Sequence, residues 1–220
     1  ALLEAAIIGV TALPWYRLPR LCGQIALASA AVLGGPLLAI YGQTYQTGAD
    51  PYGLFLTWFV IIAPWVIAAR FTALWVFEIL LLDLALFLFR VQVVGFDDAP
   101  DALQLPITIA LIHGVALVAW EWQVSRAIPW LGELWAPRLI ATLGFGALFI
   151  PAAAFVITGG DSGVEGLVGA ALLGGAVAGA YNYYRRGREG RLVVTGAVAR
   201  AMLLAAVVVG RLLFDGVDLR

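Results

Sequence analysis

Residues 71–89 read FTALWVFEILLLDLALFLF, an almost continuous apolar run that only Glu78 and Asp83 interrupt. A helix rises about 1.5 Å per residue, so a run of this length comes close to crossing the roughly 30 Å hydrocarbon layer of a bilayer. The run therefore predicts a membrane-spanning helix with two ionisable side chains inside it.

The whole chain has the same apolar character. Of its 220 residues, 63% are hydrophobic and 12% are charged, and its mean hydropathy is +0.96. A soluble domain carries about a quarter charged residues, because its surface must be wetted by water. These charges are too few for such a surface, so we predict an all-α fold, a polytopic transmembrane helical bundle surrounded by lipid.

Further apolar runs predict about eight spans, the first of them truncated. The runs are 1–13, 21–41, 52–69, 71–89, 103–122, 139–158, 164–184 and 192–214. No connection between them is long enough for a second domain, so we predict a single transmembrane domain over residues 1–220. Because the sequence begins without Met inside an apolar run, we also expect this domain to be part of a longer chain.

The arginines predict how the bundle is oriented. They gather in alternate connections, as expected of cytoplasmic loops. The arginines on this side are Arg17, Arg20, Arg70, Arg126, Arg138, Arg185, Arg186, Arg188 and Arg191. The loop 185–191 is therefore predicted to be cytoplasmic and the loop 41–52 extracytoplasmic, in a bacterial inner membrane.

Charge and composition also argue against several functions. The net charge of −1 offers no basic field for nucleic acid. A single cysteine, Cys22, excludes an internal disulfide and a multi-cysteine metal site, and a single histidine, His113, argues against a centre that needs two imidazoles. We therefore expect no metal, no cofactor and no nucleic-acid partner.

Four ionisable residues lie inside predicted spans, where such groups are costly: Glu78, Asp83, His113 and Arg200. They suit a proton relay with an arginine counter-charge, or a structural pair of Arg200 with one carboxylate beside a hydrogen-bonded His113. Glu78 and Asp83 are about 140° apart around a helix, so both cannot face one partner unaided. The structural interpretation is favoured, and the relay stays open.

Span 164–184 carries Ala171, Gly175 and Gly179 at four-residue spacing. Small residues on one face let helices approach closely in a membrane. We expect a packing surface there, either internal or with another membrane protein chain.

The connection 41–52 reads YGQTYQTGADPY and joins two apolar spans with polar residues. Asp50 before Pro51 is typical of a helix N-cap followed by proline at the first helical position. Capping does not account for Gln43, Tyr45 and Gln46, which can line an outward vestibule or bond to neighbouring spans.

At this segment the chain resembles a family of bacterial predicted inner-membrane proteins known as domain of unknown function 2157. The resemblance lies in the pattern GQxYQTGADPYxLF over residues 42–55, followed by Trp58 and Pro64-Trp65, and in the later motifs at residues 119–122 and 184–186. It implies longer relatives with further spans and a membrane protein partner. It also implies that Gln43, Tyr45, Gln46, Asp50 and Tyr52 are site candidates, for a ligand that the family does not identify.

Three classes of function follow from these features. The first is a non-catalytic component or accessory subunit of a membrane complex. The second is a transporter or channel for a small solute or ion, with coupling to protons as one form of the mechanism. The third, a lipid-modifying enzyme, is the weakest, because the acidic cluster Asp97, Asp98 and Asp101 has no histidine or basic residue beside it in sequence. We therefore expect a protein that is not an enzyme.

Overall fold

A computed structural model describes residues 2–12, 20–44, 50–95, 99–124, 133, 135–158 and 160–184. These residues form helices and contain no strand. The α-helices are α1 (Leu2–Ala12), α2 (Arg20–Thr44), α3 (Pro51–Ala69), α4 (Thr72–Phe89), α5 (Ala99–Ala102), α6 (Gln104–Val124), α7 (Trp135–Ile157) and α8 (Gly163–Tyr184). A π-helix, Arg90–Val94, continues α4.

Six of the described helices are long and apolar enough to cross a membrane: α2, α3, α4 with its π-helix, α6, α7 and α8. They confirm the all-helical membrane fold and correspond to the six central predicted spans. Helix α1 has 11 residues, about 16 Å at the usual rise, which is short of the bilayer core. The predicted span 192–214 lies outside the described residues, so a total of eight spans is not confirmed.

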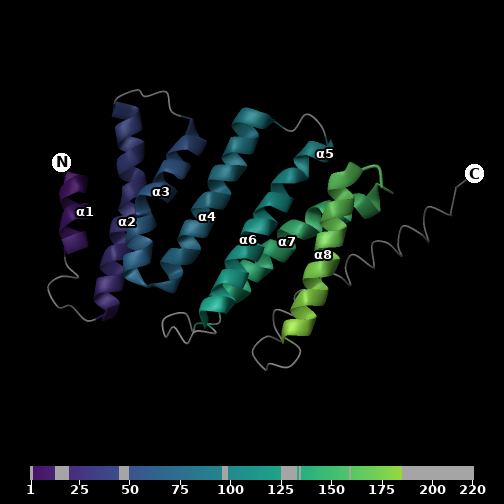
Figure 1. Ribbon diagram of the computed structural model, residues 1–220. Helices are drawn as coiled ribbons and strands as arrows, with labels where there is room; N and C mark the ends of the chain where they lie inside the picture. The colour runs from purple at the N-terminus through teal and green to yellow at the C-terminus, as the bar shows by residue number, and fades with distance from the viewer. Residues whose placement is uncertain are drawn as a thin grey trace, which may run out of the picture. The chain divides into compact units, whose positions relative to one another are not determined.

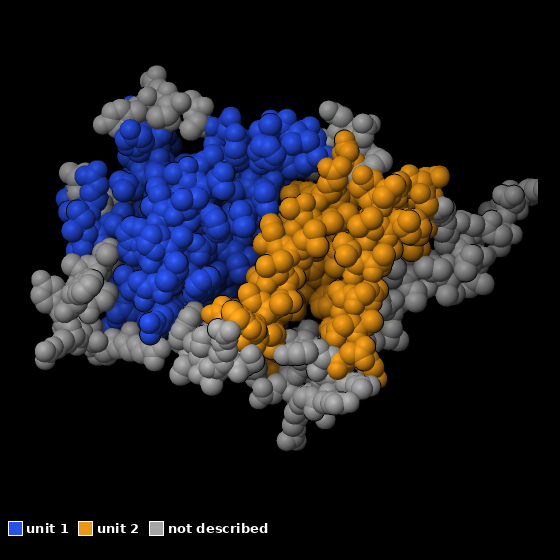
Figure 2. All heavy atoms as spheres, viewed as in Figure 1, with its two compact units in different colours: residues 1–95 blue, residues 96–220 orange. Residues whose placement is uncertain are grey.

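The helices belong to two compact units, residues 1–95 and residues 96–220 (Figure 2). The prediction of one domain over the whole chain therefore stays a prediction. In unit 1, α2, α3 and α4 pack in sequence order and alternate in direction (Figure 1). In unit 2, α7 packs against both α6 and α8.

Large apolar side chains on the outer faces of these helices remain exposed. Val115 and Val118 in α6 are each 70% exposed, and Ile67 in α3 is 65% exposed. A soluble fold would bury such residues, whereas in a bilayer they contact lipid tails. This pattern agrees with the hydropathy of the sequence.

The core of unit 1 lies where α2, α3 and α4 meet. It contains Ala31, Ile62, Val66, Ala69, Leu74 and Leu81. Trp58 of α3 packs on the small Gly34 and Gly35 of α2 and donates a 2.8 Å hydrogen bond from its Nε1 to the carbonyl of Ala31. Trp58 thus ties two helices together within the core.

The turn between α3 and α4 is tight, because Arg70 adopts a left-handed conformation (φ 46°) and ends α3. Gln24 of α2 donates from Nε2 to the carbonyl oxygens of Arg70, at 2.9 Å, and Ala69, at 3.3 Å. Carbonyls at the end of a helix lack intrahelical partners, so this side chain completes the end of α3.

The core of unit 2 lies between α6, α7 and α8 and contains Ala110, Ala141, Phe145, Leu148, Ala152 and Leu173. The closest approach of α8 to α7 is at Gly166 and Gly169. A Cβ atom added at Gly169 would lie 2.5 Å from Pro151. The helices are therefore too close at this crossing for any residue larger than glycine.

Candidate functional site

The start of α3 holds residues 50–55 of the pattern that spans residues 42–55, which we call the 42–55 motif. Asp50 occupies the N-cap position with extended backbone, and Pro51 is the first helical residue, as predicted. The predicted side-chain cap is wrong, because the Asp50 carboxylate makes no capping hydrogen bond. Instead, the Asp50 carbonyl accepts from the amides of Gly53, at 2.9 Å, and Leu54, at 3.3 Å.

Tyr52 joins this helix start to the end of α4. Its backbone amide donates to Oε1 of Gln92 in the π-helix at 3.3 Å, and its ring packs edge-on against Phe89 with centroids 5.3 Å apart. The side chain of Gln92 thus takes the place of the missing Asp50 cap. Gln43 is exposed at the end of α2, and Tyr45 and Gln46 lie outside the described residues.

Helix α4 and its π-helix carry three ionisable side chains, Glu78, Asp83 and Arg90. Glu78 is 8% exposed, on the same face as core residues Leu74 and Leu81, and Asp83 is half-buried on another face. Within the described residues, the Glu78 carboxyl group has no hydrogen-bond or ion-pair partner. Arg90, the first residue of the π-helix, is also buried, at 7% exposed.

His113 lies in unit 2 and is almost fully buried, at 1% exposed. Its Nδ1 is 2.9 Å from the carbonyl of Ile109 one turn earlier, and a Cβ added at Gly144 of α7 would lie 3.0 Å from the His113 Cβ. Arg200 lies outside the described residues. Neither unit by itself therefore contains the four groups of the predicted relay.

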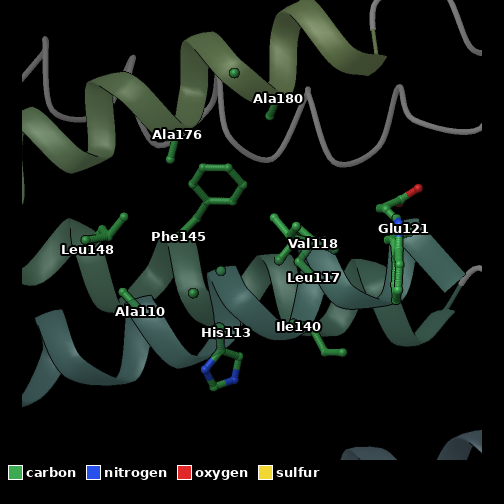
Figure 3. Close-up of a pocket in the computed structure, with 15 residues that line it drawn as sticks. Ala110, His113, Leu117, Val118, Glu121, Ile140, Phe145, Leu148, Ala176 and Ala180 are labelled. Atoms are coloured by element: carbon green, nitrogen blue, oxygen red, sulfur yellow. The ribbon is translucent and has the colours of Figure 1, made fainter.

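An apolar cavity of about 520 Å³ lies between α6, α7 and α8. We call it the wedge cavity. Phe145 and Leu148 of α7 face Ala176 and Ala180 of α8 across it, and the His113 imidazole points away from it (Figure 3). Glu121 stands at one end, so a single carboxylate borders an otherwise apolar space. A second apolar hollow of about 720 Å³ adjoins it and includes Ala171 and Gly175 in its wall.

Within the described ranges, no group of three or more histidine, cysteine, aspartate or glutamate side chains can hold a metal ion. The site candidates are therefore polar junctions and apolar cavities.

Comparison with known proteins agrees with the membrane fold. Residues 1–75 match the family of predicted membrane proteins DUF2157. The match confirms the resemblance over α1, α2, α3 and the start of α4, a range that includes the 42–55 motif. No curated protein and no solved structure matches the chain. DUF2157 is described as a predicted membrane protein, which agrees with the six apolar helices.

The wedge cavity, the burial of Arg90 and the Tyr52–Gln92 junction were not predicted. The cavity depends on how far α8 stands from its neighbours, which no local pattern encodes. Arg90 directly follows an apolar run, and no local pattern in the sequence distinguishes a buried arginine there from an exposed one. A π-helix has no simple sequence signal.

Proposed function

We propose that this membrane protein acts as a non-catalytic component of a membrane protein assembly, binding another membrane chain through α8. The observation that carries the proposal is an exposed face of α8, part of which borders the second apolar hollow. Ala171, Gly174, Gly175 and Ala178 are all exposed, and a Cβ added at Gly174 or Gly175 would meet no described atom within 4 Å. We call these four residues the α8 stripe.

The α8 stripe suits helix–helix contact in lipid. Water exclusion does not drive helices together inside a bilayer, so association depends on close packing, which small residues permit. The internal crossing of α8 with α7 uses Gly166 and Gly169 instead. The crossing with α7 therefore does not explain why the residues of the α8 stripe have small side chains. We propose that they are small because a helix of a partner chain packs against them.

The arginine distribution supports a bacterial inner-membrane location with the loop 185–191 in the cytoplasm. The connection between α2 and α3 then faces the extracytoplasmic side. In this orientation, the polar residues at the start of α3, from Asp50 to Tyr52, can contact a partner on the extracytoplasmic side of the membrane.

The assembly is tested by substituting Gly175→Leu in the full chain, expressed at native level and purified in mild detergent. We expect the variant to lose a chain that co-purifies with the wild type in fixed proportion and that crosslinks to a cysteine at Ala178. The matched control is Gly146→Leu in α7, since a Cβ there also meets no described atom within 4 Å. Retention of the partner by Gly175→Leu, or the lack of any crosslinked chain, contradicts the proposal.

A transporter is the second candidate, and the buried ionisable residues of α4 favour it. Ionisable groups inside a membrane tend to mark ion or substrate pathways. Proteoliposomes containing a pH-sensitive dye test it: an imposed membrane potential should drive a proton flux that Glu78→Gln abolishes and Glu165→Gln preserves. The absence of flux in the wild type rejects this candidate.

A further inference from the structure

We propose that the wedge cavity binds one acyl chain of an amine-headed membrane lipid, with Glu121 beside the ammonium group. The inference rests on unit 2 alone and is independent of a partner on the α8 stripe. It assigns a ligand class to a space whose size, lining and depth all match one lipid chain.

The length of the cavity matches one leaflet of a bilayer. Along α6 its wall runs from Ala110 to Trp122, which at the usual helical rise is about 18 Å. The hydrocarbon core is about 30 Å thick, so the wall covers about half of it. An acyl chain that enters at the headgroup level would end near Ala110.

The lining matches a hydrocarbon chain. Phe145, Leu148, Ile140 and Leu117 supply apolar surface, and the small Ala176 leaves the space open. A void of about 520 Å³ would deprive these side chains of dispersion contacts, which interiors rarely tolerate. A lipid tail has the apolar character and the slender shape needed to fill it.

The cavity also has an entrance from the side. Val118 and Trp122 border the cavity and are 70% and 56% exposed. A chain can therefore enter laterally from the bilayer, without a route through water.

Glu121, at the polar end of the cavity, determines which lipid headgroup we expect to bind there. Glu121 is half-buried three residues before the end of α6, and the neighbouring Trp122 is of the type that settles at the headgroup level. A carboxylate has about four lone-pair sites, so it can accept from a lipid ammonium in addition to another donor. A primary ammonium offers donors and an opposite charge, whereas an anionic headgroup would be repelled.

Photo-crosslinking of the full chain in phosphatidylcholine vesicles tests the proposal. The probe is phosphatidylethanolamine with a diazirine near the end of one acyl chain, and crosslinks are mapped by mass spectrometry. We expect labelling at Ala110, Phe145 and Leu148 above that at Val60 and Ile67, two exposed residues of α3 that report ordinary surrounding lipid.

Variants that fill the cavity provide the second measurement. Ala176→Phe and Gly179→Phe should remove the labelling of Phe145 and Leu148. Leu167→Phe, at an exposed position of α8 outside both the cavity wall and the α8 stripe, should preserve it. Cavity labelling that survives both filling variants, or that never exceeds the level at Val60, overturns the proposal.

The headgroup assignment has its own readout, which does not depend on a bulky substitution. Wild-type cavity labelling by the phosphatidylethanolamine probe should exceed labelling by a matched phosphatidylglycerol probe by about three- to tenfold, the net value of one ordinary hydrogen bond, because Glu121 is only half-buried. Glu121→Gln should abolish that preference while Glu165→Gln retains it. Equal labelling by the two probes in the wild type overturns the role of Glu121.

Discussion

Single residues in unit 1 show how closely the spans approach one another. A methyl group at Gly35 of α2 would overlap the indole ring of Trp58, whose Nε1 also bonds to Ala31. The ring therefore lies flat against glycine backbone. Trp58 serves packing inside the core, although a tryptophan in a membrane protein commonly anchors a helix at the interface.

This contact predicts a large difference between two glycine substitutions. Gly35→Ala should lower the free energy of unfolding by about 1–3 kcal/mol, because α2 and α3 must separate to admit the methyl group. Gly146→Ala should be neutral or stabilising by up to about 1 kcal/mol, since alanine favours helix where space is open. Thermal unfolding in detergent measures both, and equal effects would contradict the close approach.

Glu78 presents the opposite problem, a polar side chain on an apolar face. It is 8% exposed and has no hydrogen-bonding or charged partner among the described residues, so its burial costs free energy. Replacing such a group with an apolar one of similar size removes that cost.

We therefore expect Glu78→Leu to raise the melting temperature in detergent, by an amount equivalent to about 1–2 kcal/mol. Glu78→Gln, which keeps the shape and most of the polarity, should change it little. If Glu78→Leu is instead strongly destabilising, Glu78 has a structural partner, as in the pairing with Arg200 considered from the sequence.

At the level of elements, the start of α3 depends on a side chain from another helix. The Tyr52 amide lacks an intrahelical acceptor, and Gln92 provides one at 3.3 Å from the π-helix. The π-helix at the end of α4 is therefore coupled to the position of Tyr52 in the 42–55 motif. π-Helical turns are frequent at functional sites, and this one contacts the segment that matches DUF2157.

Two substitutions test whether Gln92, and not the Asp50 carboxylate, caps the start of α3. Gln92→Leu should cost about 1 kcal/mol of stability, the net value of one hydrogen bond, and should speed hydrogen exchange at the Tyr52 amide. Asp50→Ala should cost less than about 0.5 kcal/mol, because its carboxylate makes no cap. The reverse order of effects would show that Asp50 caps the helix after all.

The spans themselves were predictable because an apolar run of sufficient length is a local property of the sequence. The positions where they touch were not. The four-residue spacing of Ala171, Gly175 and Gly179 indicated a packing face, yet α8 crosses α7 at Gly166 and Gly169. Both sets have small residues, and only the three-dimensional path of α8 distinguishes them.

The candidate site at the scale of the whole molecule was less predictable than the fold. Glu78, Asp83 and His113 were identified because charge inside an apolar run is conspicuous. The sequence could not show which of these residues lie in the same part of the fold, and the structure places the two carboxylates in unit 1 and the imidazole in unit 2. The wedge cavity had no sequence signal, since small and apolar residues line filled and empty spaces alike.

The six spans make a final prediction about sidedness that does not rely on charge. Between the α2–α3 connection and the residues after Tyr184, the chain passes through α3, α4, α6, α7 and α8. The four-residue α5 is too short to cross. Five crossings are an odd number, so the two connections must lie on opposite sides of the membrane if all five helices span it.

Cysteine labelling in intact cells measures this directly. Cys22, the single cysteine, is exposed and is first replaced by serine. A membrane-impermeant maleimide should then label Asp50→Cys from outside, whereas Arg188→Cys should react only after permeabilisation, because arginine-rich loops stay in the cytoplasm. If both react from the same side, at least one of the five helices does not cross. If Arg188→Cys reacts from outside and Asp50→Cys only after permeabilisation, the five helices do cross the membrane. The orientation expected from the arginine distribution is then wrong for this protein.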